Sequence, residues 1–259
     1  MVYWTNSLYV NIYEGMTKYI DKNGIIFWPK LFKGILIQRY KRFMADIKLE
    51  DGQIITAHCP NSGSMKQCST PERPVYVSES FNSNRKLKYT WELIDMPDSL
   101  VGVNTIIPNL LVTAAIKSSL VPQLSGYDSL RTEVKYSDNS RIDILLENKN
   151  NAQCFVEVKN CSMVENRIAM FPDAVTSRGL KHMKALTKEV HTGSRAVIFF
   201  LVQRMDGKSF RPADHIDPSY GKALRSAIKS GVEIIVYNVE ITLENIRLST
   251  QLPYCLEIF

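Results

Sequence analysis

The chain has 259 residues, of which 45% are hydrophobic and 22% charged, a composition typical of globular proteins rather than disordered or fibrous ones. This length accommodates one large domain or two smaller ones, and either can bury a core without disulfides. The longest apolar run, residues 196–202, is far shorter than the roughly 20 residues of a membrane helix, and residues 1–15 lack a secretory signal pattern. The sequence therefore excludes a membrane partner and predicts a cytoplasmic protein.

The charge balance is basic, with 32 Lys and Arg residues against 26 Asp and Glu residues and a formal net charge of +6. A polyanion is consequently a reasonable partner, and nucleic acid is the leading candidate. The five cysteines form no paired framework and no CxxC spacing, so we expect reduced thiols and no zinc site.

Residues 1–30 are rich in aromatic residues and Asn but show no sustained period of 2 or 3.6, which predicts an N-terminal extension outside the folded domains. Met16 is an alternative start of the chain. From residue 34 the pattern changes to short extended segments at 35–37, 43–49, 54–57, 75–77 and 89–94, separated by turn signals. Short strands at this spacing are typical of a small barrel, so we predict an OB-type β-barrel over residues 31–100.

Cationic and aromatic residues occur together at two places in the predicted barrel. These candidate DNA-binding residues are Arg39, Tyr40, Lys41 and Arg42 in the first cluster, and Arg85, Lys86 and Lys88 in the second. Cations that meet phosphates and rings that stack on bases are how OB-folds bind nucleic acid. The alternative is that the rings are core residues and the cations a solvated face.

After residue 101 the pattern alternates between helix and strand. Helices are expected at 109–120, 173–190 and 220–230, and strands at 141–147, 154–159, 195–203 and 232–239. This order predicts a mixed sheet flanked by helices over residues 101–245, followed by a C-terminal tail at 246–259.

Two of these strands bring carboxylates and a lysine together. The period of two places Asp143 opposite the apolar face of its strand, and Glu157 shares a face with Lys159 on the next strand. If the strands pair as a hairpin across residues 147–151, the three side chains converge. The two carboxylates and the Val158 carbonyl are hard oxygen ligands that suit Mg²⁺ or Mn²⁺, with Glu133 as a further ligand.

We therefore predict Asp143, Glu157, Lys159 and Glu133 as a catalytic site for phosphodiester hydrolysis. The alternative is a ladder of salt bridges on a solvated face. Arg178, Lys181 and His182 share one face of the helix expected at 173–190 and would meet DNA phosphates there. Asp173 follows Pro172 and suits the start of that helix.

The order helix, Glu133, hairpin with Asp143, then Glu157-Val158-Lys159 resembles the PD-(D/E)XK nuclease core. A closer resemblance is to the sugar fermentation stimulation protein A family. The motifs that carry it are residues 36–43 (LIQRYKRF), 58–65 (HCPNSGSM), 125–127 (SGY), 133–136 (EVKY), 171–176 (FPDAVT), 178–179 (RG), 181–182 (KH) and 196–200 (AVIFF). The resemblance implies an OB-fold, a PD-(D/E)XK-like domain, non-specific DNA binding and a regulatory link to sugar (maltose) metabolism.

Three functional hypotheses follow. The first is a largely sequence-independent DNA-binding protein with a Mg²⁺- or Mn²⁺-dependent nuclease-type site, for which RNA is an alternative substrate. The second is a non-catalytic DNA-binding regulator linked to sugar metabolism. The third is a sugar-processing enzyme, for which Asp143 and Glu157 would supply the two carboxylates, although Lys159 and the basic barrel fit phosphate better. The preferred nucleic-acid structure and the oligomeric state are not determined by the sequence.

Overall fold

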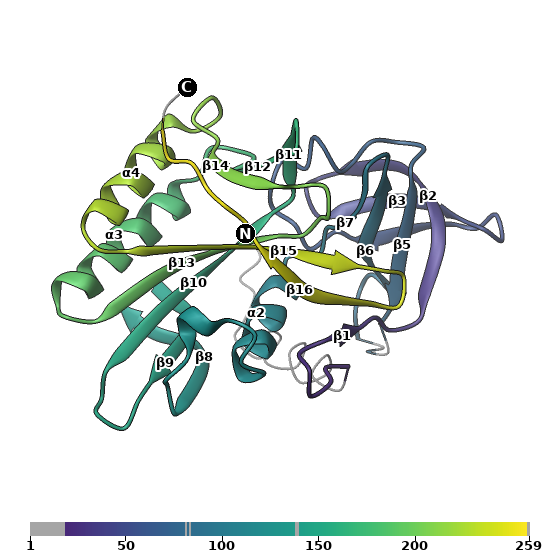
Figure 1. The fold of residues 1–259 in the computed structure, drawn as a ribbon. Coiled ribbons are helices and arrows are strands. Elements are labelled where there is room, and N and C mark those ends of the chain that lie inside the picture. Colours follow the sequence, from purple (N-terminus) through teal and green to yellow (C-terminus); the bar gives the residue numbers. More distant parts are fainter. Residues whose placement is uncertain (1–18, 81, 83, 138–139, 258–259) are drawn as a thin grey trace.

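A computed structural model describes residues 19–80, 82, 84–137 and 140–257. Residues 1–18, most of the predicted N-terminal extension, lie outside the described part of the chain. Figure 1 shows two parts, a β-barrel on one side and a larger sheet with helices on the other. No described helix is long and apolar enough to cross a membrane.

The barrel confirms the predicted OB-type fold. Its strands and the one that follows them are β2 (Leu31–Tyr40), β3 (Met44–Leu49), β4 (Ile54–His58), β5 (Pro74–Glu79), β6 (Tyr89–Met96) and β7 (Ser99–Gly102). Neighbouring strands pair antiparallel in the order β4-β3-β2-β5-β6-β7, and a parallel pairing of β4 with β6 closes the barrel. Side chains alternate along the strands, so that Leu36, Ile47 and Trp91 fill the interior while Ile35 and Ile37 face outward.

The second part is the predicted mixed sheet. Its strands, in spatial order, are β1 (Ile26–Phe27), β16 (Asn245–Gln251), β15 (Glu233–Ile241), β13 (Arg195–Val202), β10 (Gln153–Cys161), β9 (Ser140–Glu147) and β8 (Ser129–Ser137). The central strands β10, β13 and β15 run parallel, whereas β9 and β10 form the predicted antiparallel hairpin. The parallel strands read as continuous apolar runs because both faces of the sheet are covered.

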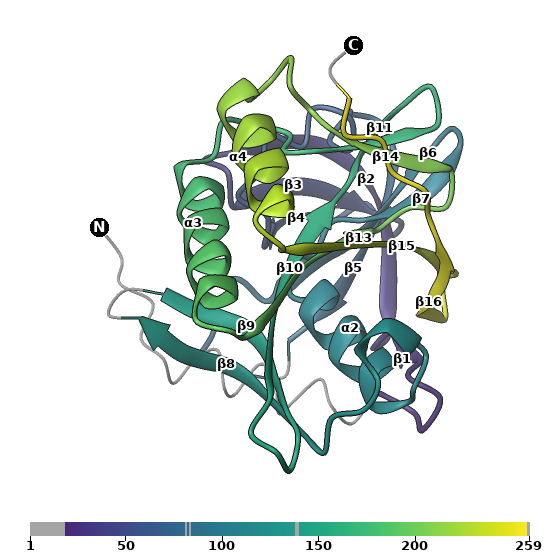
Figure 2. The ribbon, with the colours of Figure 1, turned by 60° about the vertical axis from the view of Figure 1, so that its left-hand side comes forward.

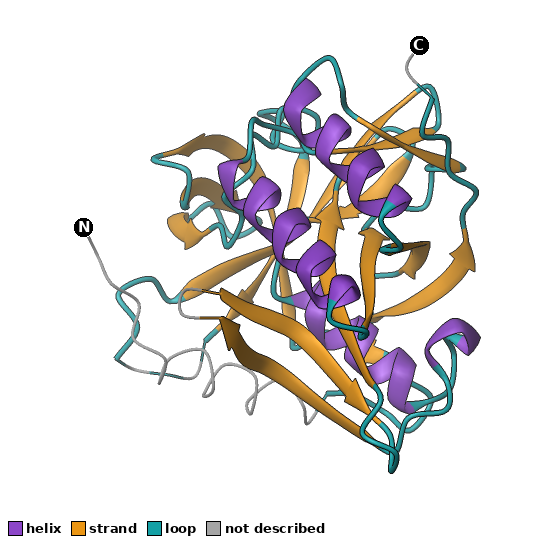
Figure 3. Ribbon diagram, turned by 90° about the vertical axis from the view of Figure 1, so that its left-hand side faces the viewer, coloured by secondary structure: helices purple, strands orange, loops and turns teal. Residues whose placement is uncertain are grey.

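Helices cover the two faces of this sheet unequally (Figures 2 and 3). Helix α2 (Ile107–Lys117) packs on one face together with the short 3₁₀ helix η1 (Pro122–Leu124). Helices α3 (Ser177–His191) and α4 (Pro218–Lys229) pack side by side on the other. A small sheet of β11 (Met163–Glu165), β12 (Ile168–Phe171) and β14 (Ser209–Pro212) lies beyond the end of β10.

The structure differs from the expected division at both ends of the chain. Residues 246–251, assigned to a tail, continue the sheet as β16, and β1 adds a further strand, with Ile26 opposite Ile246. Both isoleucines are fully buried, and the Trp28 ring donates from Nε1 to the carbonyl of Thr242. Burial of these side chains, and not a regular sequence period, holds both segments against the sheet.

Helix α3 begins four residues later than expected. Thr176 is its N-cap and accepts a hydrogen bond from the Gly179 amide at 3.0 Å, so the helix starts at Ser177. Asp173, expected at the helix start, instead accepts from the Met65 amide at 3.0 Å, while the Ser64 hydroxyl donates to the Asp173 carbonyl at 2.6 Å. Asp173 therefore joins the barrel to the C-terminal sheet.

Candidate active site

The site forms where β9 and β10 diverge. The paired register of the hairpin ends at Ile144 and Val156, and beyond it Asp143 Oδ2 accepts a hydrogen bond from the Val158 amide at 2.7 Å. The other carboxylate oxygen accepts from Nδ2 of Asn109, at the first turn of α2, at 2.9 Å. The Asp143 side chain thus replaces a backbone partner and is held in one orientation.

Glu157 is the most deeply buried acid of the site, with 1% of its surface exposed. Its Oε1 accepts from Lys159 Nζ at 2.5 Å and also contacts Nδ1 of His182. Its Oε2 is buried and has no hydrogen-bond partner among the described residues. A buried carboxylate oxygen without a partner is energetically costly, so this atom is the natural ligand position for a cation.

His182 and Arg178 on α3 extend the network around Glu157. Arg178 donates from Nε to His182 Nε2 at 3.2 Å, so Nε2 acts as the acceptor and Nδ1 carries the proton that faces Glu157. The three residues predicted to meet phosphate from one helix face therefore differ in their exposure to solvent. His182 is buried and orients Glu157, whereas Arg178 and Lys181 are exposed.

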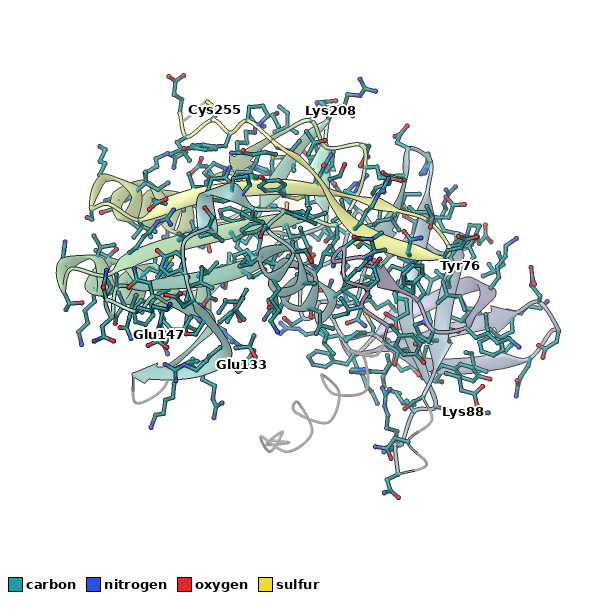
Figure 4. The ribbon with its side chains drawn as sticks, turned by 60° about the horizontal axis from the view of Figure 1, so that its bottom comes forward. Tyr76, Lys88, Glu133, Glu147, Lys208 and Cys255 are labelled. Carbon is teal, nitrogen blue, oxygen red and sulfur yellow. The ribbon has the colours of Figure 1, made fainter. Side chains whose placement is uncertain are left out.

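Glu133 lies on β8 across from Asp143, between the register pairs Thr132–Ile144 and Val134–Ile142. Its φ of 54° is left-handed, a strained conformation for a residue with a Cβ. Figure 4 labels its side chain on this strand. Burial raises the pKa of Glu133, opposed by Arg141 and Arg178 and reinforced by Glu157. Asn109, the residue that contacts Asp143, also lowers the Glu133 pKa slightly.

The two central carboxylates have opposite pKa shifts. Burial, then repulsion from Glu157, raises the pKa of Asp143 to about 7, although Lys159 and the Val158 amide act in the other direction. Burial also opposes ionisation of Glu157, but Lys159 and His182 outweigh it and hold the Glu157 pKa below its ordinary value. Without a cation, the site thus favours one ionised carboxylate over two.

The donor set fits a hard divalent cation. Within the described residues no group of three or more His, Cys, Asp or Glu side chains has the spacing of a metal site. The predicted ligand set does not require three such side chains. It combines the carboxylates of Asp143 and Glu157 with the Val158 carbonyl and leaves positions for water. The unpartnered Glu157 Oε2 is the structural feature that favours a bound cation.

Several residues predicted to bind DNA are committed to contacts inside the protein. Arg39 donates to four carbonyl oxygens, and the Tyr40 hydroxyl donates to Asp46 Oδ1 at 3.1 Å. Arg85 donates to the Thr90 hydroxyl and lies beside His58, while Lys88 pairs with Glu79 at 2.8 Å. These side chains have partners within the barrel part of the protein, which the clustering of cations in the sequence does not reveal.

Five cations of the predicted set remain exposed, with no ion pair to a described residue. They are Lys41 and Arg42 in the β2–β3 turn, Lys86 in the second cluster, and Arg178 and Lys181 on α3. Figure 4 shows Lys88, near Lys86, on the barrel and Glu133 on the opposite arm of the molecule. The second cluster therefore lies away from the candidate active site.

Two residues of the site region, Asn109 and Asp173, are not among the site residues that the sequence predicts. The sequence pattern predicts Asn109 only as the start of a helix, although a polar residue in the first turn of an apolar helix is a signal for a site residue. The sequence predicts Asp173 only as a helix-start residue. Its contact with residues 64 and 65 has no sequence signal because the two segments are more than a hundred residues apart.

Comparison with protein families agrees with this architecture. Residues 37–103 match the model of the SfsA N-terminal OB domain, and residues 106–245 match the sugar fermentation stimulation protein RE domain. These matches cover most of the chain. The chain belongs to the sugar fermentation stimulation protein family, as the motifs in its sequence indicated.

Individual relatives resemble the chain over nearly their whole length. A sugar fermentation stimulation protein homolog from Geotalea uraniireducens is 52% identical over 222 residues, covering 86% of this chain and 96% of the relative. A homolog from Geobacter sulfurreducens is 51% identical over 223 residues, with 86% and 95% covered. The solved structure of Pyrococcus furiosus SfsA in complex with Ca²⁺ has a TM-score of 0.82, 26% identity, and coverage of 90% of this chain and 98% of that one.

Proposed function

We propose that this protein binds DNA largely independently of sequence and hydrolyses phosphodiester bonds at the Asp143–Glu157–Lys159 site with a bound divalent cation, Mg²⁺ or Mn²⁺. The observation that carries the proposal is the buried Glu157 Oε2, which has no partner in the described part of the chain and lies in the same electrostatic cluster as Asp143. The related archaeal protein was solved with Ca²⁺, a cation that prefers the same oxygen ligands.

A divalent cation at this site would supply Lewis-acid polarisation of the scissile phosphate and of the attacking water. Asp143 and Glu157 would hold it, because Glu157 Oε2 accepts no hydrogen bond from a described residue and each Asp143 oxygen accepts one, which leaves a lone pair free. Lys159, fixed by Glu157, directs a positive charge toward the phosphate. His182 keeps Glu157 in place, and Glu133 stands across the strand pair as a further acid.

Binding of DNA rests on the exposed cations Lys41, Arg42 and Lys181, which carry no competing ion pair among the described residues. These residues come from the barrel and from α3, so both parts of the molecule would contact the same strand. We assign these three cations to the phosphates and none of them to the edges of the bases. Binding through the phosphates does not depend on the base sequence.

The test is cleavage of labelled single- and double-stranded DNA, and of RNA, by metal-stripped protein with and without Mg²⁺ or Mn²⁺. We expect cleavage only with metal and a loss of at least about a hundredfold in Asp143→Asn, with DNA affinity retained. Lys159→Ala should lose cleavage while keeping its affinity for Mn²⁺, because a protonated amine cannot ligate the ion.

Glu244→Gln, which alters an exposed acid in the β15–β16 turn, is the matched control and should cleave like the wild type. Wild-type protein that binds DNA yet cuts neither DNA nor RNA with either metal would contradict the nuclease proposal. It would leave the binding proposal in place and favour a regulator.

A further inference from the structure

A cavity of about 350 Å³ lies between the barrel and the C-terminal sheet. The barrel contributes Arg42 and residues 61–63 to its wall, and the C-terminal part contributes Asn160, the loop at 171–176 and Arg178. Asn160 follows the catalytic lysine on β10, and Arg178 contacts His182 of the active site. The cavity thus opens directly beside the candidate active site, and its volume is within the range of ligand pockets.

The barrel side of the cavity is firmly built. Arg39 donates hydrogen bonds at 2.9–3.0 Å to the carbonyls of Arg42, Asn61, Gly63 and Ser64, which ties the β2–β3 turn to the 61–64 loop. Asp173 fixes the same loop from the other side through the Met65 amide. Both walls are therefore held in place before any ligand arrives, which lowers the entropic cost of binding.

The β2–β3 turn carries backbone strain at the cavity. Lys41 and Arg42 have φ values of 49° and 64°, so two consecutive residues with a Cβ adopt the left-handed conformation. Each such residue is costly, and the turn is held by one hydrogen bond from Arg39 to the Arg42 carbonyl and one from the Phe43 amide to the Lys41 carbonyl. Strain of this kind clusters at sites where the side chains that a turn presents have a function. Arg42 is the one of the two that lines the cavity.

Hydrogen-bond donors dominate the cavity wall. The guanidinium of Arg42 and the Nη groups of Arg178 have no protein partner among the described residues, and Asn160 Nδ2 is likewise unpaired because only its Oδ1 accepts, from Gln203 at 2.9 Å. Asp173 is the one acid among the described lining residues, and its Oδ2 is already occupied. This arrangement suits a phosphate, with Arg42 and Arg178 as its partners.

The cavity also has an apolar element. Val175 lines the cavity and is 78% exposed. Covering its aliphatic side chain with a ligand would be favourable, because it removes apolar surface from water. A planar, mostly apolar group beside the phosphate would cover this side chain. A ligand that combines a phosphate, a planar ring and an acceptor for the Asn160 amide is a nucleotide.

We propose that this cavity takes a single unpaired nucleotide of a DNA strand, with its phosphate between Arg42 and Arg178 and its base against Val175. The proposal rests on the proposed function and names its substrate class: DNA with an unpaired nucleotide next to the bond that is cut. The pairing edge of a base is covered by the opposite strand in a duplex, so a paired nucleotide has to leave the helix to enter a cavity.

The test measures binding without divalent metal, so that no strand is cut. The probes are a short oligodeoxyadenylate, a blunt duplex and the mononucleotide dAMP. Ser62→Trp fills the cavity from an exposed lining position, and we expect about tenfold weaker binding of the oligodeoxyadenylate and of dAMP, with less than twofold change for the duplex. Arg42→Ala should weaken dAMP binding by a similar factor, without adding bulk.

Thr70→Trp is the matched control, because Thr70 is an exposed barrel residue away from the cavity, and it should bind all three probes like the wild type. Thermal melting of each variant shows whether it is folded. The proposal is overturned if folded Ser62→Trp and Arg42→Ala both bind dAMP and the oligodeoxyadenylate like the wild type. It is also overturned if inorganic phosphate competes as well as dAMP, since the cavity would then be an anion site only.

The two proposals fail separately. Wild-type protein that binds dAMP through the cavity but cuts nothing with Mg²⁺ or Mn²⁺ would remove the nuclease and keep the nucleotide site. Protein that cleaves blunt duplex as fast as single strands, with Ser62→Trp unaffected on both, would keep the nuclease and remove the nucleotide site.

Discussion

Glu157 and Tyr220 both keep a buried oxygen without a hydrogen-bond partner in the described part of the chain. For Glu157 the carboxylate belongs to the cluster of Asp143, Lys159 and His182 around the middle of β10, the candidate metal site. The Tyr220 hydroxyl lies in the core beneath α3, where the ring packs against Phe171. A buried oxygen without a partner is thus a candidate metal ligand in Glu157, whereas in Tyr220 it is an unsatisfied polar group in the core.

We therefore expect Tyr220→Phe to stabilise the protein by about 1 kcal/mol, because it removes an unsatisfied hydroxyl and keeps the ring. Urea unfolding of both proteins measures this change. Tyr40→Phe is the control and should lose about 1 kcal/mol, because the Tyr40 hydroxyl has a partner in Asp46. A destabilised Tyr220→Phe variant would mean that the hydroxyl has a partner in solution.

His58 predicts a pH dependence of stability. Burial, then the charge of Arg85, lowers the pKa of His58 from 6.5 to about 4 in the folded protein. Between these two values the unfolded chain binds more protons, so the free energy of unfolding falls as the pH drops through this window. After discounting for solvent screening at a partly exposed ring, we expect about 1 kcal/mol between pH 7 and pH 5.

The measurement compares urea unfolding of the wild type and His58→Asn at the two pH values. The variant should show a smaller loss of stability on acidification, because the remaining acids titrate alike in both proteins. An equal loss in both would show that His58 keeps its ordinary pKa.

At the scale of elements, the junction between the 61–65 loop and the segment before α3 depends on a glycine. A Cβ on Gly63 would lie 2.6 Å from Asp173 Oδ2, and that carboxylate cannot withdraw without losing its hydrogen bond to the Met65 amide. We expect Gly63→Ala to cost about 1–3 kcal/mol. The control is Ser62→Ala at the neighbouring exposed position, which should be neutral within about 0.5 kcal/mol.

Calorimetric unfolding measures both variants. If the two parts of the molecule unfold together, Gly63→Ala should lower one common transition. A Gly63→Ala protein as stable as the wild type would show that the loop and Asp173 separate easily in solution.

At the scale of the whole molecule, the exposed cations of the barrel and of α3 should act on the same DNA duplex. Each phosphate contact that is lost reduces the slope of log affinity against log salt by about 0.9. The double variant Lys41→Ala, Lys181→Ala should therefore lower the slope by about two units and weaken binding of all sequences alike.

Lys229→Ala, in the last turn of α4, removes an exposed cation remote from the site and should leave the slope unchanged. Binding measured from low to moderate salt tests both variants. An unchanged slope in the double variant would mean that Lys41 and Lys181 form only a solvated face.

Much of the fold follows from local sequence pattern. Alternation along β2–β6 predicts the barrel, and the apolar run of β13 with its neighbouring helices predicts the mixed sheet. The period of two also places Asp143, Glu157 and Lys159 on one side of a hairpin, because side-chain direction in a strand depends only on position along the chain. That Lys159 and Glu157 affect the Asp143 pKa agrees with this placement.

The remaining features depend on contacts between distant segments, for which the sequence carries no periodic signal. Only the tertiary structure separates Arg39, which binds four carbonyl oxygens, from its neighbours Lys41 and Arg42, which stay exposed. The same holds for His182 beside Glu157 and for Asp173 at the barrel loop. The sequence determined which residue types are available, whereas the partner of each buried polar group was decided by which segments pack together, because burial makes an unpaired polar group costly.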